Sequence, residues 1–247
     1  MTVLETEACP VTGPDPGPAA MAGELVDFRW DAAADAGGDP DAEALARLGR
    51  WFAEHLARPH PQLGRPGQVC PFVESASRAG TLLVHTRGPW DAIDDPAAPD
   101  AALDGLVIEM ERTFRTTSWA HPNRSLWAVV VALPRLAREH WGGLDLVQAR
   151  SKTRLAEAGL MLGQFHPDCW ETAARNPGFL VSRSPVPMLA LRSMAFHDIF
   201  FLDSEPRLFD AYSRRYGRHY GQHRPGIDPV FRRRFESARQ KFEGAHS

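Results

Sequence analysis

Apolar residues follow two different spacings along this chain, and each spacing predicts a different element. Where they recur every three or four residues they lie on one face of a helix, whereas short β-branched runs are typical of buried strands. The predicted helices cover residues 41–56, 101–115, 144–159, 206–220 and 228–242, and the predicted strands cover residues 81–86, 125–133 and 160–165.

Four further segments have weaker patterns. Residues 187–194 fit either a strand or a short helix, and residues 197–202 are apolar after the first two positions. Residues 87–100 are rich in Pro and Asp, which predicts a loop. Residues 1–39 contain mostly Pro, Gly, Ala and acidic residues with little to bury, so we expect a poorly ordered lead.

The order of these elements predicts the fold class. Strands alternate with helices between residues 81 and 165, which is typical of β-α-β-α-β units. We therefore expect one α+β domain over residues 40–247, with a mixed sheet followed by C-terminal helices. The part of this domain that carries the unusual motifs spans residues 68–202.

Composition narrows the class of protein. The chain has 247 residues, is 43% hydrophobic and carries a formal net charge of -3, so no overall attraction to nucleic acid is implied. Three cysteines are too few for a disulfide scaffold. The N-terminus lacks the pattern of a secretory signal, and no apolar stretch is long enough to cross a membrane. We expect a cytoplasmic protein without a membrane partner.

The C-terminal helices are basic. Residues 207–241 hold ten Lys or Arg against three acidic residues. One interpretation is a phosphate or nucleic-acid surface, with Tyr212, Tyr216 and Tyr220 available for stacking. The other is a solvated helix face. Because no nucleic-acid motif accompanies the charge, we favour the second interpretation and expect no nucleic-acid partner.

Residues 164–198 concentrate the side chains that carry chemistry. His166 ends a predicted strand, where imidazole would act as a general base, a metal ligand or a heme ligand. Asp168 and Cys169 follow it closely, although His-Pro-Asp-Cys is not an established zinc motif. The alternative for His166 is a structural histidine that is hydrogen-bonded to the backbone.

Two arginines in this segment are suited to holding an anion. Arg183, which precedes Ser184 and a proline, would capture a substrate carboxylate or a heme propionate, and Arg192 would do the same. For each, an internal salt bridge is the alternative. Ser184 adds a hydroxyl beside Arg183.

Two further residues are candidates for binding a cofactor. His197 opens an apolar run and would serve as an axial heme ligand, while the adjacent Asp198 would alternatively cap a helix. Cys70 precedes a proline, and such a thiolate can also ligate heme. The chain lacks a Gly-rich phosphate loop, a G-x-S-x-G motif and a C-x-x-C pair, which disfavours nucleotide-binding, serine-hydrolase and zinc-ribbon proteins.

The order of these motifs resembles that in uncharacterised bacterial domain families. Cys70-Pro71-Phe72, Phe165-His166-Pro167, Asn176-Pro177 and residues 183–189 (RSPVPML) resemble a family with an FHP…N…NRSPYPMLHLLRE signature. Ser182 here replaces the Asn of that signature. The resemblance covers residues 68–202 and implies no established function.

A looser resemblance is to the YqcI/YcgG-like heme-dependent amine N-oxygenases. The matching pieces are residues 70–72 and 176–179. This resemblance implies a heme cofactor and oxygenation of a small amine or amino acid in bacterial secondary metabolism, but it assigns the heme ligand to no residue.

Three functions therefore stay open. The first is heme-dependent oxygenation, with His166 or His197 as axial ligand and Arg183 and Arg192 holding propionates or a carboxylate. The second is a cofactor-free enzyme with His166 as general base and Arg183 as carboxylate clamp. The third is a non-catalytic binding protein that uses the basic helices. For the enzymes we expect a small-molecule substrate, and we leave a homodimer open.

Overall fold

The structure is a computed structural model, and it describes residues 40–87, 98–221 and 226–243. The lead predicted for residues 1–39 and most of the loop predicted for residues 87–100 lie outside the described residues. Within the described part, helices and strands combine into an α+β fold, as the sequence predicts.

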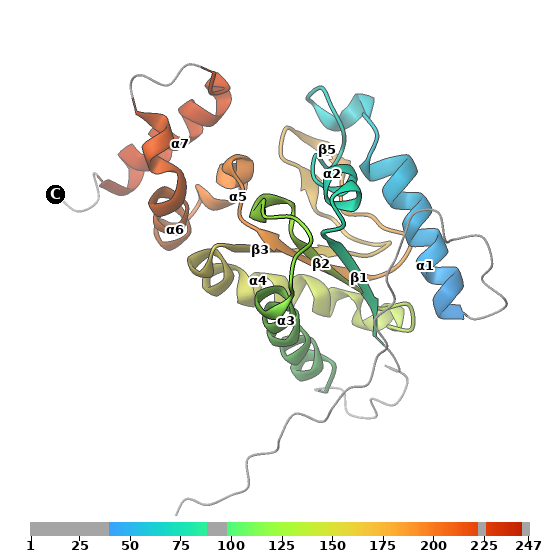
Figure 1. Cartoon of the computed structure of the whole chain (residues 1–247). Coiled ribbons are helices and arrows are strands. Elements are labelled where there is room, and N and C mark those ends of the chain that lie inside the picture. The colour runs from blue at the N-terminus through green and yellow to red at the C-terminus, as the bar shows by residue number, and fades with distance from the viewer. Residues whose placement is uncertain (1–39, 88–97, 222–225, 244–247) are drawn as a thin grey trace, which may run out of the picture.

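A four-stranded sheet lies at the centre of the fold (Figure 1). Its order is β1 (Leu82–Thr86), β2 (Ala128–Ala132), β6 (Met188–Ser193) and β3 (Leu160–Phe165). β1 and β2 are parallel, and β6 is antiparallel to both β2 and β3. β1, β2 and β3 therefore run in one direction, as β-α-β-α-β units predict, and β6 is inserted between the last two.

Helices cover both faces of the sheet (Figure 1). On one face, α3 (Ala98–Thr116) and α4 (Trp141–Ala158) pack on alternate side chains such as Val129, Val131 and Leu191. The opposite face includes Val130 and Ala132, which belong to the same core cluster as residues of α1, a π-helical turn and α2. The bounds of those three elements are Pro40–Trp51, Phe52–Leu56 and Val73–Arg78. Because successive side chains of a strand point to opposite faces of the sheet, neighbouring valines of β2 lie in different cores.

A third core lies among the C-terminal helices, which gather beyond the end of the sheet where β6 ends and β3 begins (Figure 1). They are α5 (Ile199–Leu202), α6 (Pro206–Tyr216) and α7 (Pro229–Glu243). Short 3-10 helices occur at Pro61–Leu63, Arg124–Leu126, Arg138–His140, Phe196–Asp198 and Gly217–Tyr220. No helix of the described part is long and apolar enough to cross a bilayer.

The structure refines several predicted elements. The segment 187–194, left open between strand and helix, forms strand β6. The strand predicted from Ser125 begins only at Ala128, because Asn123 accepts a hydrogen bond from the backbone of Ser125 and starts a 3-10 turn. Two elements were not predicted from the sequence, α2 and the hairpin of β4 (Thr172–Ala173) and β5 (Asn176–Leu180).

Candidate functional site

The candidate side chains fall into two separate groups. The β3 turn cluster, as we call it, comprises Asp145, His166, Cys169 and Arg183. The Arg192 cluster comprises Cys70, Phe72, Arg192, His197 and Asp198. Residues predicted as catalytic and residues predicted as cofactor-binding thus lie apart.

A tight turn at the end of β3 brings His166 and Cys169 together. The backbone N–H of Cys169 donates to the carbonyl of His166 over 3.0 Å, which closes a four-residue turn. Pro167 occupies the second position of this turn, where its fixed φ is favourable. Both flanking side chains are buried, and Cys169 is 0% exposed. The turn also lies at the carboxyl end of the parallel strands, the edge at which open α/β sheets bind ligands.

Asp145, in α4, completes this group. Its Oδ2 lies 3.1 Å from Nε2 of His166, and its Oδ1 lies 3.9 Å from Sγ of Cys169. The three potential ligand atoms all lie within 4.8 Å of one another. The Asp145 side chain is 44% exposed while that of His166 is 4% exposed, so Asp145 connects the buried imidazole to the surface.

The surroundings of Cys169 oppose a free thiolate. Burial raises the pKa of its thiol, and the nearby carboxylates of Asp145 and Glu171 add to this effect. Burial likewise raises the pKa of the Glu171 carboxyl, with Asp145 contributing. Because the thiolate is the nucleophilic form, this raised pKa disfavours Cys169 as a nucleophile.

Arg183 lies at the rim of the β3 turn cluster. Its Nε donates to the carbonyl of Cys169 over 3.3 Å, and its guanidinium lies 5.2 Å from the ring centre of Trp170. Trp170 is 76% exposed. Arg183 forms no ion pair with a residue of the described part. An exposed planar cation and an exposed aromatic ring thus stand beside the buried group.

The other two residues predicted as catalytic have different neighbours. Asp168 points to Arg138, with which it forms a surface ion pair of 2.8 Å. The hydroxyl of Ser184 is buried and donates to the carbonyl of Val186 over 2.6 Å, which fixes the Pro-Val-Pro segment. Neither side chain joins Asp145, His166 and Cys169.

The Arg192 cluster lies at the other end of β6. The guanidinium of Arg192 forms two hydrogen bonds with the fully buried carboxylate of Asp198, at 2.6 and 2.8 Å. Asp198 also accepts the backbone N–H of Ala195. Phe72 contacts two members of the group, since its ring centre lies 5.0 Å from the Arg192 guanidinium and 5.0 Å from the His197 ring.

The environment of His197 lowers the pKa of its imidazole. Burial lowers the pKa of His197, Arg192 and Arg65 lower it further, and Asp198 acts in the opposite direction. Arg65 follows Gly64, which has φ at 75° and passes so close to the backbone of Arg175 that a Cβ there would lie 2.8 Å from its carbonyl oxygen.

A heme at these residues would need an axial histidine with an available nitrogen and cations for its propionates. Nε2 of His166 faces Asp145, and Arg192 pairs with Asp198. A heme held through Nε2 of His166 and through Arg192 would have to displace these contacts, so these two residues as arranged do not fit it.

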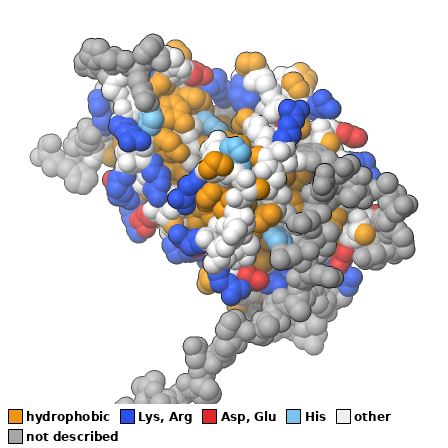
Figure 2. All heavy atoms as spheres, viewed as in Figure 1, with side chains coloured by type: hydrophobic (Ala, Val, Ile, Leu, Met, Phe, Trp, Pro, Cys, Tyr) orange, Lys and Arg blue, Asp and Glu red, His pale blue; other side chains and the backbone are white. Residues whose placement is uncertain are grey.

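The basic C-terminal helices display their cations on the surface. Figure 2 shows Lys and Arg side chains over α6 and α7. Several have acidic partners, including Arg207 with Glu157 and Arg234 with Asp203. The tyrosines point inward instead. The hydroxyls of Tyr212 and Tyr220 lie 2.6 Å apart, and that of Tyr216 donates to Met194, so these rings are not arranged for base stacking.

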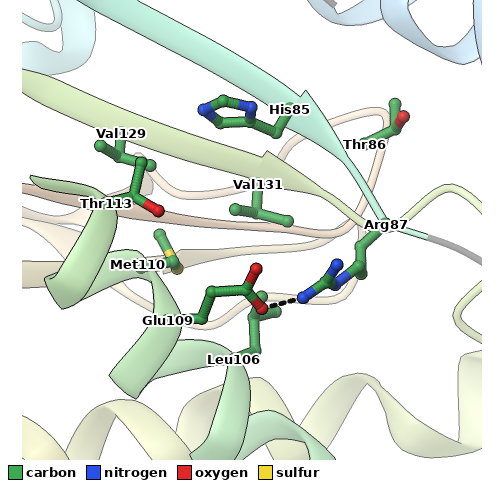
Figure 3. Close-up of a pocket in the computed structure, with 9 residues that line it drawn as sticks. All are labelled: His85, Thr86, Arg87, Leu106, Glu109, Met110, Thr113, Val129 and Val131. Carbon is green, nitrogen blue, oxygen red and sulfur yellow. Dashed lines mark hydrogen bonds and ion pairs between the residues drawn. The ribbon is translucent and has the colours of Figure 1, made fainter. Parts of the chain in front are cut away.

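A shallow pocket lies between β1, β2 and α3 (Figure 3). It encloses about 380 Å³ of space, which is partly open to solvent. An ion pair between Arg87 and Glu109 borders it. Neither cluster lines this pocket.

One member of the β3 turn cluster was missed by sequence reasoning. Asp145 precedes His166 by 21 residues, on the predicted helix 144–159, and no local motif links the two. The two residues meet only because α4 packs on β3 in the folded chain.

Comparison with known proteins gives one match. A family model described as a domain of unknown function, DUF6875, matches residues 45–225. No match to the chain was found among curated proteins or among solved structures. The matched residues include both clusters, as the resemblance to an uncharacterised domain family implies. Because the match covers most of its length, the chain belongs to the DUF6875 family.

Proposed function

We propose that this chain is an enzyme that acts on a small carboxylate-bearing molecule at the β3 turn cluster. The position of Arg183 supports the proposal. It brings an exposed guanidinium, without an ion-pair partner in the described part, beside the buried imidazole of His166 and its partner Asp145. A planar cation of this kind binds a carboxylate through two parallel hydrogen bonds.

Each residue has a role in this proposal. Arg183 holds the carboxylate of the substrate, and the exposed ring of Trp170 packs against its apolar part. Asp145 orients His166, as a carboxylate orients the histidine of a catalytic pair. The pair serves either as the proton-transfer group or as part of a metal site.

The two other functions have less support. Heme-dependent N-oxygenation would follow from the resemblance to the YqcI/YcgG-like proteins, but two of the residues that would hold the heme, His166 and Arg192, already contact carboxylates. A binding surface on the basic helices would use cations such as Arg207 and Arg234, which are already paired with carboxylates.

The test starts from binding and proceeds to turnover. A panel of 2-oxo, 2-hydroxy and 2-amino acids is screened against the protein by ligand-observed NMR, and bound ligands are followed for conversion. Arg183→Ala should weaken binding about tenfold or more, since a charge-assisted hydrogen bond contributes about 1.5–3 kcal/mol. Arg207→Ala, an exposed arginine on α6, is the control and should bind as the wild type does.

Asp145→Asn and His166→Gln separate binding from chemistry. Both should retain carboxylate binding and lose conversion. Equal affinity in the Arg183→Ala variant and the wild type would rule out the proposed clamp, and conversion that survives both other substitutions would rule out the proposed reaction centre.

A further inference from the structure

We propose that Asp145, His166 and Cys169 form a binding site for a divalent transition-metal ion of the zinc type, with solvent or substrate as the fourth ligand. No local sequence motif predicts this site, because its ligands come from a turn and from a separate helix. The role of the ion in catalysis rests on the proposed function. Metal binding itself does not, and it is tested separately.

The geometry is close to that of a tetrahedral site. Donor atoms at about 2.0–2.3 Å from a zinc ion lie about 3.3–3.8 Å from one another. Here Nε2 of His166 lies 3.1 Å from Oδ2 of Asp145, and Sγ of Cys169 lies 3.9 Å from Oδ1 of the same carboxylate. Taking one donor atom from each residue, the three atoms lie within 4.8 Å of one another. Small side-chain adjustments would therefore bring the three donors around one ion.

The turn explains why two ligands are already in place. The hydrogen bond from Cys169 N–H to the His166 carbonyl fixes the first and fourth residues of the turn side by side. Asp145 is held by α4, the helix that packs directly on β3. Ligands on rigid elements are positioned before the ion arrives, which lowers the entropic cost of binding.

The donor set suits a zinc-type ion. Thiolate and imidazole favour zinc and similar transition ions over magnesium and calcium, which prefer oxygen ligands only. As the sulfur–metal bond forms, the thiol proton of Cys169 leaves to solvent. The negative charges of the thiolate and the Asp145 carboxylate then balance the charge of the ion, so the site with its ion bound carries no net charge.

A purely structural role for His166 explains less. A buried structural histidine normally has hydrogen-bond partners for both ring nitrogens. The side chain of His166 is 4% exposed, yet Nδ1 has no hydrogen-bond partner in the described part and Nε2 has only Asp145. Nε2 therefore faces Asp145 alone within the described part, and Asp145 is itself a candidate ligand.

The exposure of Asp145 gives the ion an open side. Three protein ligands and one exchangeable position are typical of catalytic rather than structural zinc sites. A bound ion would activate a water molecule or polarise a substrate oxygen there, and Arg183 at the rim would hold the carboxylate of the same substrate.

Cobalt substitution tests the site without an activity assay. In a Cys9→Ser/Cys70→Ser background, Cys169 is the only thiol, because the chain has three cysteines. The chelator-treated protein is titrated with Co²⁺ and followed by absorbance. We expect saturation at one ion per chain, a thiolate-to-cobalt charge-transfer band and the intense visible bands of a tetrahedral site.

Matched variants identify the ligands. In the same background, Cys169→Ser should abolish the charge-transfer band, and Asp145→Asn should weaken Co²⁺ binding about tenfold or more. Circular dichroism shows whether each variant is folded. The proposal is overturned if the folded background protein gives no charge-transfer band, or if the band persists in Cys169→Ser. Carboxylate binding to Arg183 can succeed or fail independently of either result.

Discussion

His166 and Arg192 lie on opposite faces of the sheet and near opposite ends of the β3–β6 pair. Arg192 pairs in register with Met161, whereas His166 directly follows Phe165, which pairs with Met188. Five residues along a strand correspond to about 16 Å, and an odd number of steps reverses the side-chain direction. The β3 turn cluster and the Arg192 cluster therefore cannot form one site, although His166 and Arg192 are close in sequence.

The Arg192–Asp198 ion pair should be important for stability. Asp198 is 0% exposed and Arg192 is 23% exposed. Asp198→Asn leaves the arginine charge largely buried without its partner, so we expect a loss of about 3 kcal/mol or more in the free energy of unfolding. Urea denaturation measures this loss. The control is Asp210→Asn, which removes an exposed pair with Arg214 and should cost less than about 0.5 kcal/mol. Similar losses in both variants would contradict the prediction.

The three tyrosines of the chain should resist ionisation while the protein is folded. These three tyrosines are Tyr212, Tyr216 and Tyr220. Burial raises the pKa of each, that of Tyr220 to about 12. At about pH 10, where free tyrosine is half ionised, ultraviolet absorbance should therefore show clearly less phenolate in the folded protein than in the unfolded chain.

The unfolded chain does ionise at that pH. The folded state retains its protons longer, so stability should fall as pH rises above about 10. Phenolate absorbance near pH 10 in a protein whose circular dichroism is unchanged would show that the three hydroxyls are accessible.

His197 should make the protein less stable in acid. Its pKa is lowered, first by burial, so between its folded pKa and 6.5 the unfolded chain binds more protons than the folded chain. Stability should therefore fall as the pH is lowered through this window. His197→Gln should flatten the change in urea midpoint between about pH 7 and about pH 5.5. His55, whose pKa burial also lowers, retains its share in that variant. A pH dependence unchanged by the substitution would argue against this environment.

Two glycines should respond in opposite ways to alanine. Gly105 lies within α3, and nothing lies within 4 Å of an added Cβ, so Gly105→Ala should stabilise the protein by up to about 1 kcal/mol. Gly159 ends α4 with φ at 81°, and a Cβ there would collide with the guanidinium of Arg215. Gly159→Ala should cost about 1–2 kcal/mol. Thermal unfolding of both variants measures these changes in stability. A change of the same sign in both variants would be evidence against the assigned backbone conformations.

Local pattern was sufficient to predict most of the fold. The run 160–165 predicted β3 with its observed bounds, and Gly159 predicted the end of α4. The short helix α2 was missed because six residues cannot show a helical period. The insertion of β6 between β2 and β3 was not predicted, because strand order depends on long-range pairing that periodicity does not encode.

The candidate site was predictable only in part. The turn residues His166 and Cys169 and the motif residue Arg183 were visible because histidine, cysteine and arginine next to proline are conspicuous. Asp145 was not, since a single acidic residue on a helix has no distinctive pattern. Ser184 and Asp168 looked equally conspicuous, yet one fixes a backbone turn and the other forms a surface ion pair.

A crystal structure with the carboxylate that binds most tightly tests the proposed reaction centre most directly. We predict density for the carboxylate at hydrogen-bonding distance from the guanidinium of Arg183, with the rest of the molecule directed towards Asp145. Density for the ligand at Arg192 or Arg65 instead, with none at Arg183, would contradict the proposal.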